Sequence, residues 1–160
     1  PFKLTSLIMK ERAEIVDTGI PLFYKVQIEI EAPAKKIFDF LSNPNNHLLM
    51  DGSDMLRGKI KGPDRLFLGA KFGMKMRYGI PYIITNQVIE YQENKAIAWQ
   101  HLLHNVWRYE IVEMNANKCL VIESWDGRRA KWKWWIDDSY KWVPKAMAKT
   151  LVNLKGLISA

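Results

Sequence analysis

The chain has 160 residues, a length that fits one domain with a sizeable core. Its composition, with 48% hydrophobic and 26% charged residues, is that of a globular protein. No apolar run reaches the roughly 18 to 20 residues that a membrane-spanning helix needs. The first residues lack the pattern of a signal peptide, and the single cysteine, Cys119, cannot form an internal disulfide. We therefore expect a cytoplasmic protein without a membrane span.

The net charge of +7 is partly concentrated in residues 128–142, which we call the Trp-rich segment. Basic residues between aromatic ones are common in nucleic-acid-binding proteins. However, the other basic residues are spread along the chain, and Asp126, Asp137 and Asp138 lie in or beside this segment. A distributed charge of this kind favours weak, non-specific binding. We therefore do not expect a nucleic acid as partner.

We interpret residues 1–20 as an N-terminal extension and residues 21–160 as the domain. Thr5 or Ser6 can cap a short helix in the extension that continues to about Glu11. The periodic patterns of the domain begin only after the extension.

A strand and two short helices are predicted first. Apolar and polar residues alternate over positions 24–30, which is the period of a half-buried strand. Ala32-Pro33 begins a helix, because proline suits the first helical turn, and Asn43-Pro44 ends it. Residues 45–50 form a second short helix, which the turn Asp51-Gly52-Ser53 follows.

The middle of the chain predicts six strands joined by short turns. From Phe72 to Tyr78, apolar residues alternate with basic ones, so one face of that strand is apolar and the other polar. Parallel strands need long crossover connections, so the short turns predict an antiparallel sheet. The predicted strands cover residues 55–61, 66–78, 81–91, 95–103, 105–114 and 118–126.

A long amphipathic helix is predicted over residues 139–158. Its apolar residues recur at intervals of three and four positions, and Pro144 must lie near its start. The apolar face consists of Val143, Met147, Leu151, Leu154 and Ile158. The order of elements is that of an α+β chain, in which the helices are segregated from the sheet.

Six stretches, in this order and at this spacing, carry a resemblance to a known superfamily. They are Ile30-Glu31-Ala32-Pro33, Asp51-Gly52-Ser53, Phe72-Gly73-Met74, Ile97-Ala98-Trp99, Trp107-Arg108-Tyr109-Glu110 and Val121-Ile122-Glu123-Ser124-Trp125-Asp126. Over residues 24–158 the chain resembles the START-like (SRPBCC) superfamily, in particular its polyketide cyclase/dehydrase and lipid-transport branch. The resemblance implies a helix-grip fold: a curved antiparallel β-sheet wraps around a long C-terminal α-helix, and two short helices follow the first strand.

In such a fold, the inward positions of the strands face the inner side of the helix around an apolar cavity, typically of about 300–1,000 Å³. Strand parity, anchored on the apolar residues, predicts which side chains line it, and a slip of one residue would reverse an assignment. The predicted ligand-binding residues are Phe72, Met74, Met76, Tyr82, Ile84, Asn86, Val88, Trp99, His101, Trp107, Tyr109, Val121, Glu123, Trp125, Met147, Leu151 and Leu154.

Five side chains are candidates for catalysis. His101 can hydrogen-bond a ligand carbonyl or exchange a proton near neutral pH, or it is a core or sheet-edge histidine with its own partners. Glu123 can act in catalysis, or it pairs with Arg108 or another cation on a neighbouring strand, since a buried carboxylate needs a partner. Arg108, Tyr82 and Tyr109 complete the set, and Arg108 or one of the tyrosines can stabilise an enolate oxygen.

Three familiar kinds of site have no sequence signal. His101 and His104 are three positions apart on a strand and so face opposite sides, and no second group of metal ligands accompanies them. The sequence has no glycine-rich phosphate loop and no serine in a nucleophile elbow. We expect neither a metal nor a tightly bound cofactor.

Three functions fit these features. The first is to bind or carry a small hydrophobic molecule, such as a lipid or a polyketide, in the internal cavity. The second is a polyketide aromatase/cyclase-like enzyme, which holds a poly-β-ketone in a folded shape and moves protons. The third is a protein-interaction module that uses the Trp-rich segment, whose side chains can also form a lid or mouth. Whether the protein is a monomer or a homodimer stays open.

Overall fold

The computed structural model describes residues 12–160, so the helix predicted from Thr5 or Ser6 to Glu11 lies outside the described residues. The strands are β1 (Glu14–Val16), β2 (Phe23–Ile30), β3 (Leu56–Lys61), β4 (Lys71–Tyr78), β5 (Ile80–Gln92), β6 (Ala96–His101), β7 (Val106–Asn115) and β8 (Lys118–Asp126). The helices are α2 (Ala34–Ser42), α3 (Asn46–Met50) and α4 (Val143–Ser159), with two 3-10 helices, η1 (Lys133–Trp135) and η2 (Ser139–Lys141).

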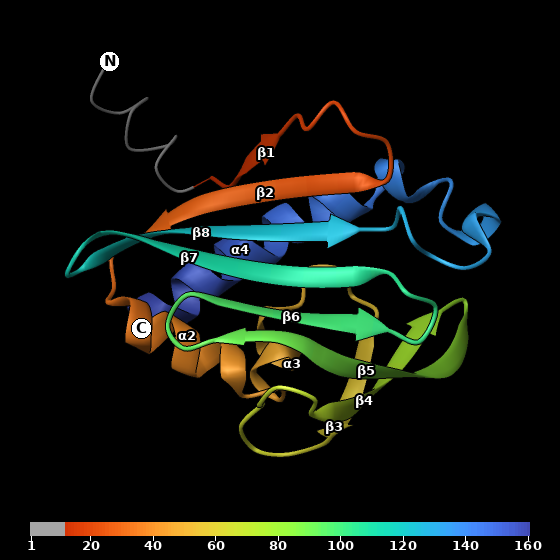
Figure 1. Cartoon of the computed structure of the whole chain (residues 1–160), viewed down its shortest axis with the longest axis horizontal. Helices are drawn as coiled ribbons and strands as arrows, with labels where there is room; N and C mark the ends of the chain where they lie inside the picture. Colours follow the sequence, from red (N-terminus) through yellow and green to blue (C-terminus); the bar gives the residue numbers. More distant parts are fainter. Residues whose placement is uncertain (1–11) are drawn as a thin grey trace.

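The strands form one eight-stranded sheet in the order β1-β2-β8-β7-β6-β5-β4-β3. Every neighbouring pair is antiparallel. Figure 1 shows the sheet curving in front of α4, with α2 and α3 on the same side of the sheet as α4. This arrangement is the predicted helix-grip α+β fold, with two short helices after the first long strand.

The inner face of α4 forms one wall of the core. Met147, Leu151 and Leu154 are fully buried, as their helical spacing predicts. The helix begins at Val143 and not at residue 139, because Pro144 fits only within the first turn of a helix. Residues 139–141 form η2 instead.

Two strand predictions differ from the structure. The strand predicted from residue 66 begins at Lys71, because Gly69 has a φ of 86°, in the left-handed region that breaks an extended chain. β1 lies within the predicted N-terminal extension and pairs with β2 at the sheet edge, a strand too short to be predicted from alternation. The division of the chain at residue 20 stays a prediction.

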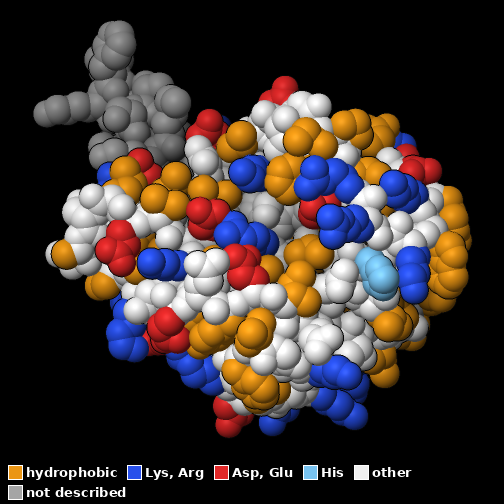
Figure 2. Space-filling model, viewed as in Figure 1, with side chains coloured by type: hydrophobic (Ala, Val, Ile, Leu, Met, Phe, Trp, Pro, Cys, Tyr) orange, Lys and Arg blue, Asp and Glu red, His pale blue; other side chains and the backbone are white. Residues whose placement is uncertain are grey.

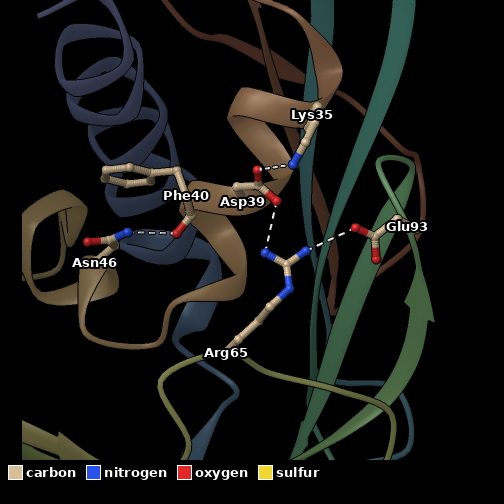
Figure 3. A network of polar contacts seen from close by, with 6 residues as sticks. All are labelled: Lys35, Asp39, Phe40, Asn46, Arg65 and Glu93. Atoms are coloured by element: carbon tan, nitrogen blue, oxygen red, sulfur yellow. Dashed lines mark hydrogen bonds and ion pairs between the residues drawn. The ribbon is translucent and has the colours of Figure 1, made fainter.

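A polar network at the surface connects α2 with the β3–β4 loop and the β5–β6 turn (Figure 3). Arg65, in the loop between β3 and β4, donates to Asp39 of α2 at 2.8 Å and to Glu93 of the β5–β6 turn at 3.0 Å. Lys35 also donates to Asp39, at 2.6 Å, and Asn46 of α3 donates to the carbonyl of Phe40 at 3.0 Å. The charged side chains of this network are exposed, so each pair contributes little stability.

The turn after α3 passes very close to α4, and Gly52 makes this possible. A Cβ at Gly52 would lie 2.5 Å from the carbonyl oxygen of Ala146 and 2.7 Å from the amide nitrogen of Thr150. Both are backbone atoms of a helix and cannot move aside as a flexible side chain can. We expect G52A to lower the free energy of unfolding by about 1–3 kcal/mol, measured by urea denaturation.

Gly156→Ala is the matched control for this substitution. Gly156 lies on the exposed side of α4, and a Cβ there would have no neighbour within 4 Å. Because alanine is the better helix former, G156A should raise the free energy of unfolding by about 0.5–1 kcal/mol. Equal losses in the two variants would contradict the close approach at Gly52.

Candidate functional site

Two rows of side chains cross the sheet on the side that faces α4. In each row, every residue is the register partner of the next one on the neighbouring strand. One row is Val88, Trp99, Trp107, Trp125 and Tyr24, and the other is Tyr91, Ile97, Tyr109, Glu123 and Val26. Trp125 stacks on Tyr24 with 5.4 Å between ring centroids. These two rows are therefore mainly aromatic, and Glu123 lies within the second row.

Glu123 is a buried carboxyl whose two oxygens have different surroundings. The Tyr109 hydroxyl donates a hydrogen bond to Oε1 at 2.9 Å, whereas Oε2 is buried without a hydrogen-bond partner. Burial raises the pKa of Glu123 to about 8; the Tyr109 hydrogen bond opposes this rise and the Asp51 carboxylate adds to it. A carboxyl with this pKa is mainly neutral at pH 7, and because Oε1 accepts from Tyr109, Oε2 is the oxygen left free to carry the proton.

Arg108 does not pair with Glu123, so that prediction was wrong. Its Nε donates to Glu90 at 2.6 Å, and a second guanidinium nitrogen donates to Glu110. Arg108 is adjacent to Tyr109 in β7, and successive side chains of a strand point to opposite faces of a sheet. The guanidinium therefore lies on the outer face and is not available as a catalytic group of the interior.

His101 lies at the end of β6 and is half-buried. Its Nδ1 accepts a hydrogen bond from the backbone N–H of Leu103 at 3.0 Å, and its ring lies 6.1 Å from that of Trp135. Burial lowers the pKa of His101, so the ring is neutral at pH 7. The histidine thus has a partner within its own turn, and a role in catalysis stays a prediction.

The inward side chains of the β4–β5 hairpin become more exposed toward its tip. Asn86 pairs in register with Phe72, and both are buried. Tyr82 pairs with Met76 nearer the tip and is 37% exposed. The hairpin therefore leads from the buried interior to one end of the molecule.

Most of the predicted lining residues are buried, and the exceptions are those near the tip of the β4–β5 hairpin, His101 and Trp107. Those that are buried are Phe72, Met74, Asn86, Val88, Trp99, Tyr109, Val121, Glu123, Trp125, Met147, Leu151 and Leu154. Met76, Ile84, His101 and Trp107 are half-buried. Whether these side chains bind a ligand stays a prediction.

His47 and Asp51 belong to the same interior but were not predicted. The His47 ring lies perpendicular to that of Trp99 with 4.9 Å between centroids, and its Nε2 is 2.9 Å from the carbonyl oxygen of Leu41. Burial lowers the pKa of His47, and burial, followed by Glu123 and then Asp51, raises the pKa of Tyr109. A helix as short as α3 shows no periodic pattern, so its inward positions cannot be recognised in the sequence.

The Trp-rich segment lies at the end of the molecule to which the hairpin leads (Figure 1). The backbone N–H of Lys131 donates to the carbonyl of Leu103 at 2.9 Å, next to the β6–β7 turn. The ring of Trp142 stacks on Tyr78, at the tip of the β4–β5 hairpin, with 6.5 Å between centroids. We call this end, where the segment meets the two hairpin tips, the open end; a function as lid or mouth stays a prediction.

Two hollows in the surface lie outside the predicted cavity. One, of about 290 Å³, lies between β1, β2 and the start of α4, where Ile15, Phe23 and Pro144 line it. The other, of about 430 Å³, lies beside Arg108 and Glu110 on the outer face. Neither hollow lies between the sheet and the inner face of α4, so the cavity predicted there stays a prediction.

Residues 12–160 contain no group of three or more His, Cys, Asp or Glu side chains that could hold a metal ion. Within the same residues, no helix has the length and apolar character needed to cross a membrane.

Comparison with known proteins gives relatives without an assigned activity. No family model matches the chain. Two curated proteins of Mycobacterium tuberculosis, the uncharacterized proteins Rv0088 and MT0096, are 36% and 35% identical to it over 113 residues. The match covers 70% of this chain and 50% of each relative, so the chain spans about half the length of these proteins.

Solved structures identify the fold. A protein from Arthrobacter aurescens has a TM-score of 0.71 at 9% identity, with 91% of both chains covered. Norcoclaurine synthase from Thalictrum flavum has a TM-score of 0.62 at 14% identity, covering 95% of this chain and 91% of the synthase. Protein Ms6760 from Mycobacterium smegmatis has a TM-score of 0.64 at 12% identity, covering 91% of this chain and 96% of Ms6760. These likenesses show that the chain has the same helix-grip fold as these structures. Membership of the START-like (SRPBCC) superfamily, and of its polyketide cyclase and lipid-transport branch, stays a prediction.

The raised pKa of Glu123 makes stability depend on pH. Because its pKa is about 8 when folded and near 4.5 when unfolded, the folded protein holds a proton that the unfolded chain releases between these values. The stability that this group contributes is fully present below its unfolded pKa of 4.5 and is lost as the pH rises toward its folded pKa of about 8. Relative to E123Q, the wild type should lose up to about 1.4 kcal/mol of unfolding free energy per pH unit in this range.

Urea denaturation of both proteins at several pH values measures this difference. Glu113→Gln, at an exposed position of β7, is the matched control and reports the pH dependence contributed by other groups. A difference between wild type and E123Q that stays constant from about pH 5 to pH 8 would show that Glu123 is ionised in the folded protein.

Proposed function

We propose that the protein binds a small, mainly apolar molecule between the sheet and α4, and that Glu123 donates a hydrogen bond to an oxygen atom of this molecule. The observation that carries the proposal is Oε2 of Glu123, which is buried and has no partner. An unpaired buried polar group costs about 1–3 kcal/mol. A ligand oxygen that accepts this hydrogen bond offsets that cost.

The surroundings of Glu123 favour a neutral ligand with a flat apolar body. Trp99, Tyr109 and Trp125 offer aromatic faces from the sheet, and the apolar face of α4 lies opposite. The nearby Asp51 carboxylate disfavours an anionic ligand. A single carbonyl or hydroxyl group on an otherwise apolar molecule matches this lining, and lipid-like and polyketide-like molecules both belong to this class.

Flexible side chains provide the room for such a ligand. Met74 and Met147 are buried on the two opposing walls, and Met76 lies nearer the open end. Methionine is unbranched and changes rotamer readily, so a ligand that enters between sheet and helix can displace these side chains at low cost. Entry at the open end requires the least movement, because the side chains of the β4–β5 hairpin are least buried there.

The structure of norcoclaurine synthase supports the class of ligand. That protein was solved in complex with dopamine and hydroxybenzaldehyde, two small aromatic molecules that carry oxygen atoms. Its identity to this chain is 14%, so the likeness indicates a kind of ligand and not a particular compound.

A polyketide aromatase/cyclase-like activity is the second candidate, and the same carboxyl group favours it. A group with a pKa of about 8 can give and take a proton near neutral pH, as a general acid–base catalyst must. In this reading, Glu123 protonates a ligand carbonyl oxygen and Tyr109 positions the carboxyl group through its hydrogen bond to Oε1. Binding alone requires only the hydrogen bond.

Two matched probes test the proposed hydrogen bond: acetylnaphthalene, which has a carbonyl oxygen, and ethylnaphthalene, which has none. Titration monitored by tryptophan fluorescence gives both Kd values for wild type and for Glu123→Leu. Since a hydrogen bond contributes about 0.5–1.5 kcal/mol, the variant should bind acetylnaphthalene roughly 3- to 10-fold more weakly. Its Kd for ethylnaphthalene should be nearly unchanged.

Controls separate the hydrogen bond from general damage. Glu113→Leu, the same substitution at an exposed position of β7, should leave both Kd values unchanged. In the wild type, affinity for acetylnaphthalene should fall as the pH rises through about 8, because the ionised carboxylate has no proton to donate. Equal losses for the two probes in Glu123→Leu would contradict the role of Glu123, and saturable binding of neither probe by the wild type would contradict the ligand site.

A further inference from the structure

Six large apolar side chains are exposed at the open end of the molecule. They are Tyr78, Ile80, Leu102, Trp132, Trp134 and Tyr140, each more than 60% exposed, and we call them the aromatic rim. They come from three parts of the chain: the tip of the β4–β5 hairpin, the β6–β7 turn and the Trp-rich segment. Figure 1 shows these three parts at the same end of the sheet, and Figure 2 shows apolar side chains along that edge of the surface. Exposed patches of this kind often mark sites of interaction.

Contacts between the three parts hold the aromatic rim in place. Trp142 stacks on Tyr78, and the ring of Trp135 lies 6.1 Å from that of His101. The indole N–H of Trp135 also donates to the carbonyl of Lys131 at 3.1 Å. Trp132 has a φ of 53°, a left-handed conformation that bulky residues rarely adopt. The exposed tryptophans thus belong to a segment anchored on both hairpins.

Basic side chains surround the aromatic rim. The Trp-rich segment contains five basic and two acidic residues. Asp138 pairs with Lys141, and Asp126, just before the segment, pairs with Arg128. Among residues 12–160, no carboxylate lies within ion-pair distance of the exposed side chains of Lys131 and Lys133. These two ammonium groups lie in the sequence on either side of Trp132, so apolar and positively charged groups alternate here.

We propose that the open end docks on the surface of an anionic phospholipid bilayer. Tryptophan and tyrosine favour the boundary between lipid headgroups and acyl chains, because their rings are apolar and their N–H or O–H groups are polar. Lysine side chains beside them are attracted to anionic headgroups. The aliphatic side chains Ile80 and Leu102 can enter the apolar layer, whereas they offer no stacking face to a nucleic-acid base.

Docking in this orientation goes beyond the proposed binding function. It places the open end, from which the β4–β5 hairpin leads into the interior, against the lipid surface. An apolar molecule can then move between bilayer and protein without crossing water. The docking surface and the Glu123 site share none of the residues named for either, so separate variants test them.

Sedimentation with vesicles tests the docking. The wild type should bind vesicles of phosphatidylcholine with about 30% phosphatidylglycerol, and bind pure phosphatidylcholine at least tenfold more weakly. Trp132→Ala with Trp134→Ala should reduce binding to the anionic vesicles at least tenfold. Lys131→Glu with Lys133→Glu should do the same and should weaken the dependence of binding on salt.

Matched double variants elsewhere on the surface control for the loss of apolar area and of charge. Leu49→Ala with Leu68→Ala removes two side chains that are 61% and 64% exposed away from the open end, and should leave binding unchanged. Lys36 lies in α2 and Lys95 in the β5–β6 turn, and Figure 1 shows both elements at the end of the sheet away from the Trp-rich segment. Lys36→Glu with Lys95→Glu makes the same change in net charge and should reduce binding far less than the change at Lys131 and Lys133.

Two results would overturn the docking proposal. One is binding to anionic vesicles that the tryptophan and lysine variants leave intact. The other is absence of vesicle binding, whether or not the aromatic rim then binds a single-stranded oligonucleotide or a second copy of the chain. Acetylnaphthalene titration of the same variants keeps the two proposals apart, because the rim variants should retain the wild-type Kd for that probe.

Discussion

The burial of the Glu123 carboxyl inside an aromatic and aliphatic interior is the constraint on which the rest of the account depends. An ionised carboxylate at this position would lose its hydration and gain only one hydrogen bond, from Tyr109. Burial disfavours the charged form, and no cation bonds to the carboxyl to offset this effect. The pKa of Glu123 therefore rises and the group keeps its proton. A neutral acid whose O–H group has no partner can donate a hydrogen bond to a ligand oxygen. Without a ligand, the same unpaired group lowers the stability of the fold.

Several parts of the fold maintain this surrounding. The register of β2, β7 and β8 places Glu123 between Tyr109 and Val26, and α4 covers the row from the other side. The turn at Gly52 brings the chain after α3 close to α4, with its N–H donating to Thr150 at 2.9 Å. Asp51, in the same turn, keeps its carboxylate near Tyr109 and Glu123 while accepting a hydrogen bond from the N–H of Ser53.

Strand alternation and helical spacing predicted most of the strands, the long helix and the inward direction of Glu123, Trp125 and Met147, whereas the family resemblance predicted how the sheet and the helix assemble. Alternation and helical spacing are local patterns in the sequence, and they determine which side chains share one face of a strand or of a helix. The partner of Glu123 was predicted less well, because it depends on the register of two strands: the partner is Tyr109, and Arg108 points outward. The inward position of His47 lay beyond sequence reasoning, because α3 has only five residues and shows no period. The strand was predicted to begin at residue 66 because apolar residues already occur there, among them the buried Leu66. These residues belong to the loop before β4, which begins only at Lys71.

The protonation state of Glu123 can be observed directly by infrared spectroscopy, as the difference between wild type and E123Q. The account predicts a carbonyl band of a protonated carboxylic acid in the wild type at neutral pH. This band should be absent from E123Q and should disappear as the pH rises past about 8. A wild-type spectrum that shows only carboxylate at neutral pH would mean that Glu123 is ionised in the folded protein, and would contradict the account.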